Sequence, residues 1–557
     1  MPCRLLQARG AFPLRVRCPS RPPVGTVVSG ETVVTSNFLT ARPTILVEVP
    51  LPPQASCQTS TTTGDHSYER HRPEDTLLYR TLQDNWSGFL AEVEMGGGEL
   101  PSFVLDEVEA YMRCGIPVHG FLRVRCEDCG HSRVVAFSCK RRGFCPSCLG
   151  RRMADTAAFC VDHVFPQAPV RQYVLTAPYS LRFQMAYSPD ITSAVLRALI
   201  SAITSDLRRR ARKRKIRGRL QTGSLTVVQR FGSSLSLNVH FHVVAIDGLF
   251  AEQPDGSLLF HPLPAPTDED VARTARAVHR KVSRYLRRRM SVVDDKQASF
   301  LDRLANASVQ GLVATGPRRG CRVLRFGTEP GEAQSEIKSK RCADVGGFNL
   351  HANVRVAAND REGLEHLCRY LARPPIANDR LSQLPDGKLA LRFKQAWRDG
   401  TTHIVFTPYE LIEKLIPLIP RPRSHLVRYH GILGPAAKDR PKVVPLRPAS
   451  QAESLPAGEG ATSREIDARS IPGFTRTTWA ALLKRVFLVD ALTCPKCNGR
   501  MKILAVITTP DSVRAILDNL GIPSQAPRRK AARPPPQTEF TGGDRDAFYA
   551  DPPSPES

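Results

Sequence analysis

The sequence lacks any run of about 18 apolar residues, the length that a membrane-spanning helix needs. Its first residues also lack the apolar segment of a secretory signal. We therefore expect neither a spanning helix nor export, and we expect the protein in the cytoplasm. The phosphate-binding loop G-x-x-x-x-G-K-S/T is missing too, as is any internal repeat of useful length. Nothing in the sequence therefore indicates an ATP-driven reaction or a repeat architecture.

Acidic residues are scarce relative to basic ones. The 557 residues include 53 Asp and Glu against 79 Lys and Arg, which gives a formal net charge of +26. Each phosphate that a Lys or Arg neutralises releases a condensed counterion, so this excess favours nucleic acid as a partner. An acidic membrane surface is the competing interpretation. A chain of this length can form several domains with a sizeable core, which favours a catalytic protein over a lone binding module.

The 15 cysteines do not indicate a disulfide framework, because their number is odd and six of them fall in C-x-x-C pairs. Such pairs are typical of thiolate metal ligands in a reducing compartment. Cys126-Glu-Asp-Cys129 and Cys145-Pro-Ser-Cys148 are separated by 15 residues. At this spacing, two tight turns can place four sulfurs tetrahedrally around one structural Zn²⁺. Cys139 could replace one of these ligands.

The third pair, Cys494-Pro-Lys-Cys497, has no partner pair downstream. By itself it is half of a zinc ribbon. A metal ion there would need ligands from elsewhere in the chain or from another subunit. A reduced turn without metal is the alternative.

The pattern of strands and helices favours an α+β fold. Interleaved strands and helices without regular βαβ spacing occupy about 170 to 435, and two helical segments precede the first cysteine pair. Segments rich in Pro, Ser and Ala lie outside these regions. The predicted organisation is a disordered extension (1–70), an N-terminal helical and zinc-binding domain (75–165), a catalytic domain (170–435), a linker (436–470), a C-terminal cysteine-pair module (474–520) and a disordered basic tail (524–557).

Two histidines alternate with apolar residues in the segment NVHFHVV. On a β-strand the side-chain period of two places His240 and His242 on one face, where the two imidazoles can share a divalent metal. A pair of hydrogen-bonded surface histidines is the alternative. Gln229, on the preceding strand of the predicted hairpin, is the candidate third ligand, and Asp247 is interpreted as a turn residue before Gly248. A metal here would polarise a scissile phosphate.

A predicted helix, REGLEHLCRYLARPP, carries Leu364, Leu367, Cys368 and Leu371 on one stripe. Tyr370 lies off this stripe, so its phenol is free to face a substrate, although a packing role is the alternative. A phenol that attacks phosphorus forms a phosphotyrosine, which stores the energy of the broken phosphodiester. Later rejoining of the strand would then need no ATP.

Basic residues concentrate at about 207–220 and 280–290 and beside the cysteine pairs. Such runs are often only solvated faces, but with this net charge we expect contacts with the DNA backbone. The candidate DNA-binding residues are Lys140, Arg141, Arg142, Arg208, Arg209, Arg210, Arg212, Lys213 and Arg214.

Three unusual elements follow one another in the chain: SCKRRGFCPSC, then QRFGSSLSLNVHFHVVAIDG, then LCRYLARPPIA with WRDGTTHIVF. In this order they resemble the rolling-circle transposases of the insertion-sequence-ninety-one (IS91) family, over about residues 75 to 510. The resemblance implies a zinc-binding domain before an HUH endonuclease domain, built on an antiparallel sheet, that cuts one DNA strand and attaches to its 5′ end. It also implies single-stranded element ends and target DNA as partners. By motif, Cys126, Cys129, Cys145 and Cys148 would hold Zn²⁺, His240 and His242 would hold Mg²⁺ or Mn²⁺, and Tyr370 would attack.

Some members of that family have two tyrosines four residues apart, and here the earlier position is His366. The sequence therefore resembles the single-tyrosine branch. Two other classes of function stay open. One is a metal-dependent hydrolase in which His240, His242 and Asp247 bind a metal that activates water. The other is a non-catalytic, zinc-dependent DNA-binding regulator.

Overall fold

The computed structural model describes residues 71–289, 299–327, 340–397, 399–444 and 492–531. The predicted extension before residue 71 lies outside these ranges, as do the linker from residue 445 onward and the tail from residue 532. Among the described residues, no helix is both long and apolar enough to cross a membrane.

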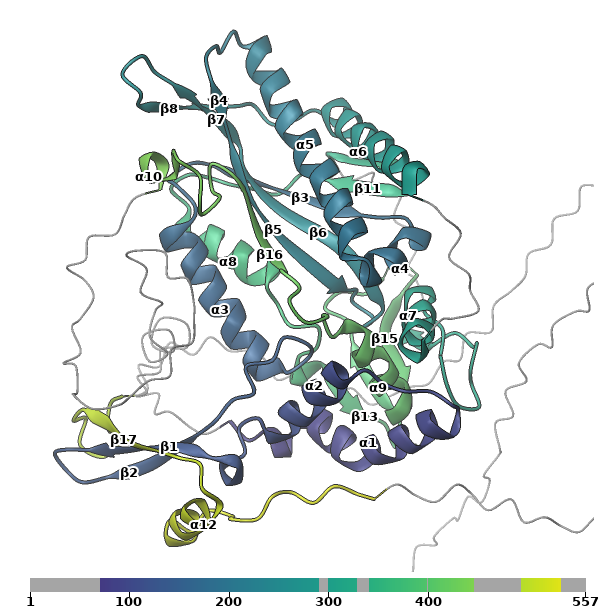
Figure 1. Cartoon of the computed structure of the whole chain (residues 1–557), viewed down its shortest axis with the longest axis vertical. Helices are drawn as coiled ribbons and strands as arrows, with labels where there is room; N and C mark the ends of the chain where they lie inside the picture. The colour runs from purple at the N-terminus through teal and green to yellow at the C-terminus, as the bar shows by residue number, and fades with distance from the viewer. Residues whose placement is uncertain (1–70, 290–298, 328–339, 398, 445–491, 532–557) are drawn as a thin grey trace, which may run out of the picture.

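A central antiparallel sheet organises the described part of the chain (Figure 1). Its order is β10-β11-β3-β6-β5-β16, and β12 pairs additionally with β3. The predicted hairpin is present, since β5 and β6 pair with Gln229 opposite His240. This mixture of helices with an antiparallel sheet confirms the α+β prediction. The strands are β3 (Val170–Thr176), β5 (Gly223–Phe231), β6 (Leu237–Ile246), β10 (Cys342–Val345), β11 (Phe348–His351), β12 (Arg355–Val356) and β16 (Val427–Gly431).

Helices cover both faces of this sheet. On one face, α4 (Tyr179–Tyr187), α5 (Pro189–Lys213) and α6 (Asp268–Arg289) pack over side chains such as Phe241 and Val243. On the other face, α3 (Pro146–His163) and α8 (Arg361–Leu371) pack over Val244 and Ile246. Strand β6 is therefore buried on both sides, which explains its nearly continuous apolar sequence. His240 and His242 share the parity of Val244 and thus lie on the face covered by α3 and α8.

The remaining elements extend this core. The N-terminal helices share one buried cluster with α5, α6 and the central sheet. Three smaller sheets have the orders β17-β1-β2, β13-β14-β15-β9 and β4-β7-β8. Their strands are β1 (Phe121–Cys126), β2 (Ser132–Ala136), β4 (Leu220–Gln221), β7 (Gly248–Glu252), β8 (Leu258–Pro262), β9 (Leu324–Gly327), β13 (Leu381–Gln383), β14 (Leu389–Arg392), β15 (Thr401–Phe406) and β17 (Met501–Ile507), and the other helices are α1 (Leu77–Met95), α2 (Ser102–Arg113), α7 (Phe300–Gln310), α9 (Pro408–Leu415), α10 (Arg440–Val443) and α12 (Pro510–Asn519).

A buried ion pair closes the end of β6. Arg171 on β3 forms two bonds with Asp247, Nε to Oδ1 at 3.2 Å and Nη2 to Oδ2 at 2.8 Å. Its Nη1 also donates to the carbonyl of Ala352 at 3.0 Å. Asp247 follows His242 by five residues along the strand, or roughly 16 Å at ~3.3 Å per residue. Asp247 therefore holds the sheet together and is not positioned to share a metal with the histidines.

Replacing Asp247 by alanine should lower the free energy of unfolding by about 3–5 kcal/mol, because Arg171 would stay buried without its partner. Urea denaturation followed by circular dichroism measures this loss. The matched control is Asp386→Ala, which breaks an exposed pair with Lys388. Its cost should stay below about 1 kcal/mol. Equal stability of the two variants would show that the buried pair does not hold the sheet.

Candidate active site and cysteine clusters

The two histidines of β6 face each other on the buried side of the sheet. Their Nε2 atoms lie 3.1 Å apart, and His240 and His242 are only 8% and 4% exposed. The outer nitrogen of His240, Nδ1, lies 2.8 Å from the carbonyl oxygen of Asn238. A carbonyl can only accept, so this Nδ1 carries the proton and Nε2 of His240 carries a lone pair.

Gln172 on β3 controls the second imidazole. Its Nε2 lies 2.9 Å from Nδ1 of His242, so that Nδ1 accepts and the proton of His242 sits on Nε2, between the two rings. A half-turn of the Gln172 amide would present its oxygen instead. The proton would then move to Nδ1 of His242, and both Nε2 lone pairs would face one point. Gln172 thus acts on the tautomer of a potential metal ligand.

Burial keeps both imidazoles neutral at pH 7. Desolvation lowers the pKa of His240 to about 4, and it lowers the pKa of His242 well below its usual value. The positive charge of Arg373 acts in the same direction on both rings. Neutral imidazole is the form that binds metals.

Gln229 supplies an unpaired oxygen beside the histidines. Its Nε2 donates to the carbonyl of Leu371 at 3.0 Å. Its Oε1 is buried and has no hydrogen-bond partner among the residues that the structure describes. Leaving such an acceptor unsatisfied costs about 1–3 kcal/mol, which is typical of a site that a ligand completes. Two imidazole nitrogens and this amide oxygen fit a divalent cation such as Mn²⁺ or Mg²⁺ and leave positions open for substrate.

Helix α8 brings Tyr370 to the same place. The helix begins at Arg361 and is capped by Asp360, whose Oδ1 accepts from the backbone N–H of Gly363 at 2.8 Å. The stripe predicted to be apolar is buried, as expected, whereas Tyr370 is 45% exposed. The ring of Tyr370 stands perpendicular to that of His242, with centroids 5.9 Å apart. The structure therefore brings together the four predicted residues His240, His242, Gln229 and Tyr370, which come from β5, β6 and α8.

Arg373 is a residue of this site that the sequence analysis missed. Its guanidinium carbon lies 4.6 Å from the centroid of the Tyr370 ring. Its Nε is buried and lacks a hydrogen-bond partner within the described residues. The only signal in the sequence is its position three residues after Tyr370. His366, in contrast, is largely exposed, with its Nε2 3.9 Å from Glu362.

The prediction that one ion is held by the first two C-x-x-C pairs is wrong. The described residues contain two groups of four cysteines, and the Sγ atoms in each lie within 4.8 Å of one another. The predicted spare ligand Cys139 belongs to the first group, which also contains a cysteine that the sequence analysis did not single out, Cys114. The first group is Cys114, Cys139, Cys145 and Cys148, and the second is Cys126, Cys129, Cys494 and Cys497.

The hairpin of β1 and β2 explains why the pairs separate. Cys114 precedes β1 and Cys139 follows β2, so both lie at the base of the hairpin, whereas Cys126 and Cys129 lie at its tip. Six residues of β1 put roughly 17 Å between base and tip at ~3.4 Å per residue. No single ion can span that distance.

The first group has the features of a structural zinc site. The Sγ atom of Cys148 lies 3.3 Å from that of Cys139 and 3.6 Å from that of Cys114. Hydrogen bonds from Cys114, Cys139 and Cys145 lower the pKa of Cys148. Backbone N–H groups of Cys139 and Lys140 donate to two of the sulfurs, both at 3.3 Å. Four thiols around one point, supported by donors to sulfur, fit a closed tetrahedral Zn²⁺.

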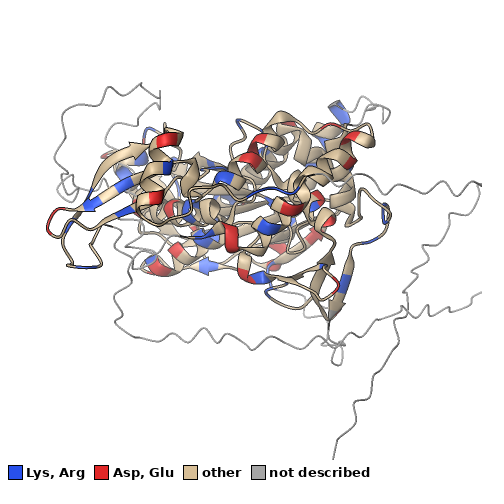
Figure 2. Cartoon of the chain, turned by 90° about the horizontal axis from the view of Figure 1, so that it is seen from below, with Lys and Arg blue, Asp and Glu red and all other residues tan. Residues whose placement is uncertain are grey.

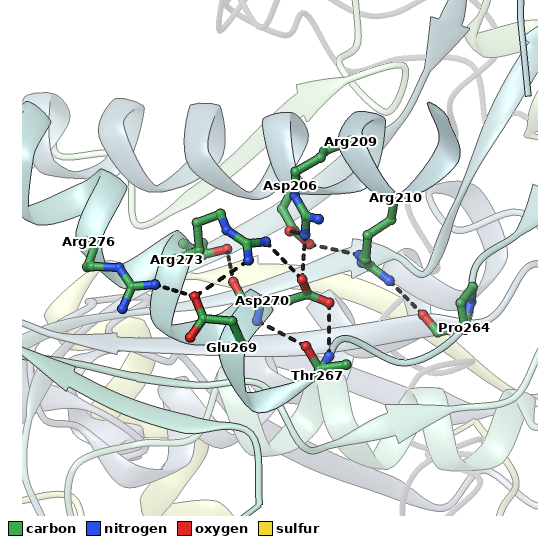
Figure 3. Close-up of polar contacts among 10 residues, drawn as sticks. Asp206, Arg209, Arg210, Pro264, Thr267, Glu269, Asp270, Arg273 and Arg276 are labelled. Carbon is green, nitrogen blue, oxygen red and sulfur yellow. Dashed lines mark hydrogen bonds and ion pairs between the residues drawn. The ribbon is translucent and has the colours of Figure 1, made fainter. Parts of the chain in front are cut away.

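Ion pairs within the protein engage two of the predicted DNA-binding arginines, and one of the two is buried. Figure 3 shows Arg209 and Arg210 of α5 with Asp206 and with Asp270 of α6. Arg210 is 5% exposed, and it binds Asp206 at 2.8 Å and the carbonyl of Pro264 at 2.6 Å. Arg209 binds both carboxylates. The prediction of a DNA contact is therefore wrong for Arg210. Arg209 joins α5 to α6 through its bonds to Asp206 and Asp270.

The other candidate DNA-binding residues differ in exposure. Arg142 is half-buried and donates to the carbonyl of Ser424 at 2.7 Å. Figure 2 shows Lys and Arg interleaved with Asp and Glu, so this view presents no single basic face. The exposed residues of the predicted set are Lys140, Arg141, Arg208, Arg212, Lys213 and Arg214.

Sequence comparisons match two ranges of the chain to transposase families. The family described as "Putative transposase" matches residues 223–440, which include β5, β6 and α8. The family described as "Transposase zinc-binding domain" matches residues 81–177, which include the whole first cysteine group. The transposase for insertion sequence element IS801 of Pseudomonas savastanoi pv. phaseolicola is 23% identical over 450 residues, or 78% of this chain and 90% of that protein. No solved structure matches the chain.

Substitutions of Gln172 test how the histidine site binds metal. Gln172→Leu leaves His242 Nδ1 without a partner and should weaken Mn²⁺ binding about 10- to 100-fold. Gln172→Glu can only accept from Nδ1, so it should hold the metal-binding tautomer and bind Mn²⁺ at least as tightly as the unchanged chain. Isothermal titration of the zinc-loaded protein measures both. Equal affinities for the two variants would contradict this role of Gln172.

Proposed function

Because the chain belongs to the IS91 family of transposases, we propose that it cuts and rejoins single DNA strands through Tyr370, which becomes joined to the 5′ end of the cut strand. One observation carries the proposal: the exposed Tyr370 ring stands against His242, next to two neutral imidazoles and an unpaired amide oxygen. A nucleophile and a place for a cation thus lie side by side.

The chemistry of the cut follows from these groups. His240, His242 and Gln229 would hold Mg²⁺ or Mn²⁺, which would polarise the scissile phosphate. The Tyr370 oxygen attacks phosphorus, the bond from phosphorus to the 3′ oxygen breaks, and the proton of the phenol passes through solvent to that oxygen. The guanidinium of Arg373, 4.6 Å from the tyrosine ring, places positive charge where the phosphate gains negative charge.

Rejoining is the reverse reaction. A 3′ hydroxyl attacks the phosphorus of the phosphotyrosine, a new phosphodiester forms, and the bond from phosphorus to the Tyr370 oxygen breaks. The proton of the hydroxyl passes through solvent to the Tyr370 oxygen. The energy of the bond is kept throughout, which agrees with the missing ATP-binding loop. Helix α8 carries a single tyrosine, so one chain holds one covalent strand at a time. A second cut requires either release of Tyr370 by strand transfer or a second chain.

The two alternatives have less support. A hydrolase that uses Asp247 as a metal ligand conflicts with the structure, because Arg171 occupies both carboxylate oxygens of Asp247. A DNA-binding regulator needs no buried, unpaired oxygen beside two neutral histidines. It would gain support if the purified chain binds element-end DNA but never cuts it with Mg²⁺ or Mn²⁺ present.

The test uses labelled single-stranded DNA from the ends of the element that encodes the chain, incubated with Mn²⁺. A protein–DNA band that resists denaturation is expected, and Tyr370→Phe should abolish it while keeping the ring in place. Tyr179→Phe is the matched control, since Tyr179 is also an exposed tyrosine, and it should keep the band. Persistence of the band in Tyr370→Phe would falsify the assignment of the nucleophile.

A further inference from the structure

The second cysteine group joins two segments that are far apart in the chain. Cys126 and Cys129 come from the tip of the β1–β2 hairpin, and Cys494 and Cys497 come from the segment before β17. The Sγ distances are 3.4 Å for Cys126 to Cys497 and 3.5 Å for Cys129 to Cys494, across a separation of 365 residues in the latter pair. Figure 1 shows β17 beside β1 and β2. Cys126 and Cys129 lie within the matched range 81–177, whereas Cys494 and Cys497 fall beyond both matched ranges.

The two C-x-x-C turns have the same backbone geometry. In the first turn, the backbone N–H of Gly130 donates to the carbonyl of Cys126 at 3.1 Å. The backbone N–H of Cys126 donates to the carbonyl of His131 at 2.8 Å. In the second turn, the backbone N–H of Asn498 donates to the carbonyl of Cys494 at 2.9 Å. The backbone N–H of Cys494 donates to the carbonyl of Gly499 at 2.8 Å. Gly130 and Asn498 both have left-handed φ angles, 71° and 59°. Such matching turns are the usual way to point two thiols from each strand at one ion.

The two turns are packed directly against each other. A Cβ on Gly499 would lie 1.9 Å from Oδ2 of Asp128 and 3.2 Å from Sγ of Cys126. Gly499 of the second turn therefore lies directly against side chains of the first turn, including the thiol of Cys126.

The apolar core around this group is too small to hold the segments by itself. Strand β17 pairs with β1 from Cys126 opposite Met501 to Phe121 opposite Ile507. Among the described residues, two small buried clusters lie beneath this sheet, one around Val124 and one that α12 completes. A three-stranded sheet with so little buried area needs a metal or a covalent link for stability.

We propose that Cys126, Cys129, Cys494 and Cys497 bind a second structural Zn²⁺, which ties the C-terminal segment 492–531 to the N-terminal hairpin. Binding releases the thiol protons and leaves a closed tetrahedral site with four sulfurs and no open position, so the ion is structural rather than catalytic. The proposal does not depend on the role of Tyr370.

The ion also determines whether the end of this segment stays docked. Beyond α12, Arg529 binds Glu109 of α2 at 2.8 Å, and Lys530 binds Asp84 of α1 at 2.8 Å. Exposed pairs of this kind contribute about 0–1 kcal/mol each. They cannot hold the segment without the zinc-bound turns, so loss of the ion should release it.

Metal analysis of the full chain tests the proposal. The unchanged chain should contain two zinc ions, and the double variant Cys494→Ser/Cys497→Ser should contain one. Cys342→Ser, which removes a cysteine outside both groups, is the matched control and should retain two. Two ions in the double variant would overturn the proposal, as would one ion both in the unchanged chain and in the double variant.

Hydrogen exchange separates loss of the ion from general misfolding. In the double variant, the amides of β1 and β17 should exchange at least about tenfold faster, whereas those of β5 and β6 should be unchanged. A chain whose sole substitution is Cys497→His still has four zinc ligands at this group, so it should keep both the second ion and the protection of β1 and β17. Unchanged protection of β1 and β17 in the double variant would show that no ion holds them.

Discussion

Burial of two imidazoles on the α3 and α8 face of β6 is the constraint on which the candidate active site depends. Packing on both sides of the strand removes the rings from water, which lowers the pKa of each and keeps them neutral. Buried nitrogens need partners, and Asn238 and Gln172 satisfy the two outer ones. The two inner nitrogens are left to each other, 3.1 Å apart, with the proton of His242 between them. Once that proton moves to Nδ1 of His242, both Nε2 lone pairs would face an incoming cation.

The same face of the sheet sets the position of Tyr370, the proposed nucleophile. Helix α8 buries Leu364, Leu367 and Leu371 against it, and the carbonyl of Leu371 accepts from Gln229 on the sheet. The end of the helix is therefore tied to a residue that also offers an oxygen toward the histidines. Tyr370 lies one residue before that carbonyl. The backbone that carries the proposed nucleophile is thus joined directly to a candidate metal ligand.

Local periodicity in the sequence predicted most of this site, because its members are arranged by strand and helix geometry. The period of two placed His240 and His242 on one face, and the helical stripe left Tyr370 outside the core. Contacts between distant segments have no such signal. Arg373 follows the end of α8 and contacts the ring of Tyr370. Arg210 lies inside a basic run of the sequence, yet it is buried and binds Asp206 and the carbonyl of Pro264.

The cysteines show the same limit, since equal C-x-x-C spacing does not say which pairs meet. The hairpin of β1 and β2 determines which pairs meet, because its base and its tip lie far apart. C-x-x-C pairs that are neighbours in sequence therefore contribute to different groups. Donor chemistry then distinguishes the candidate metal sites. Thiolates favour Zn²⁺ in closed tetrahedral sites, whereas two imidazoles and an amide oxygen leave room for phosphate oxygens around a harder cation. The cysteine groups can therefore fix the fold around the hairpin, while the donor set of the histidine site suits the proposed catalytic metal.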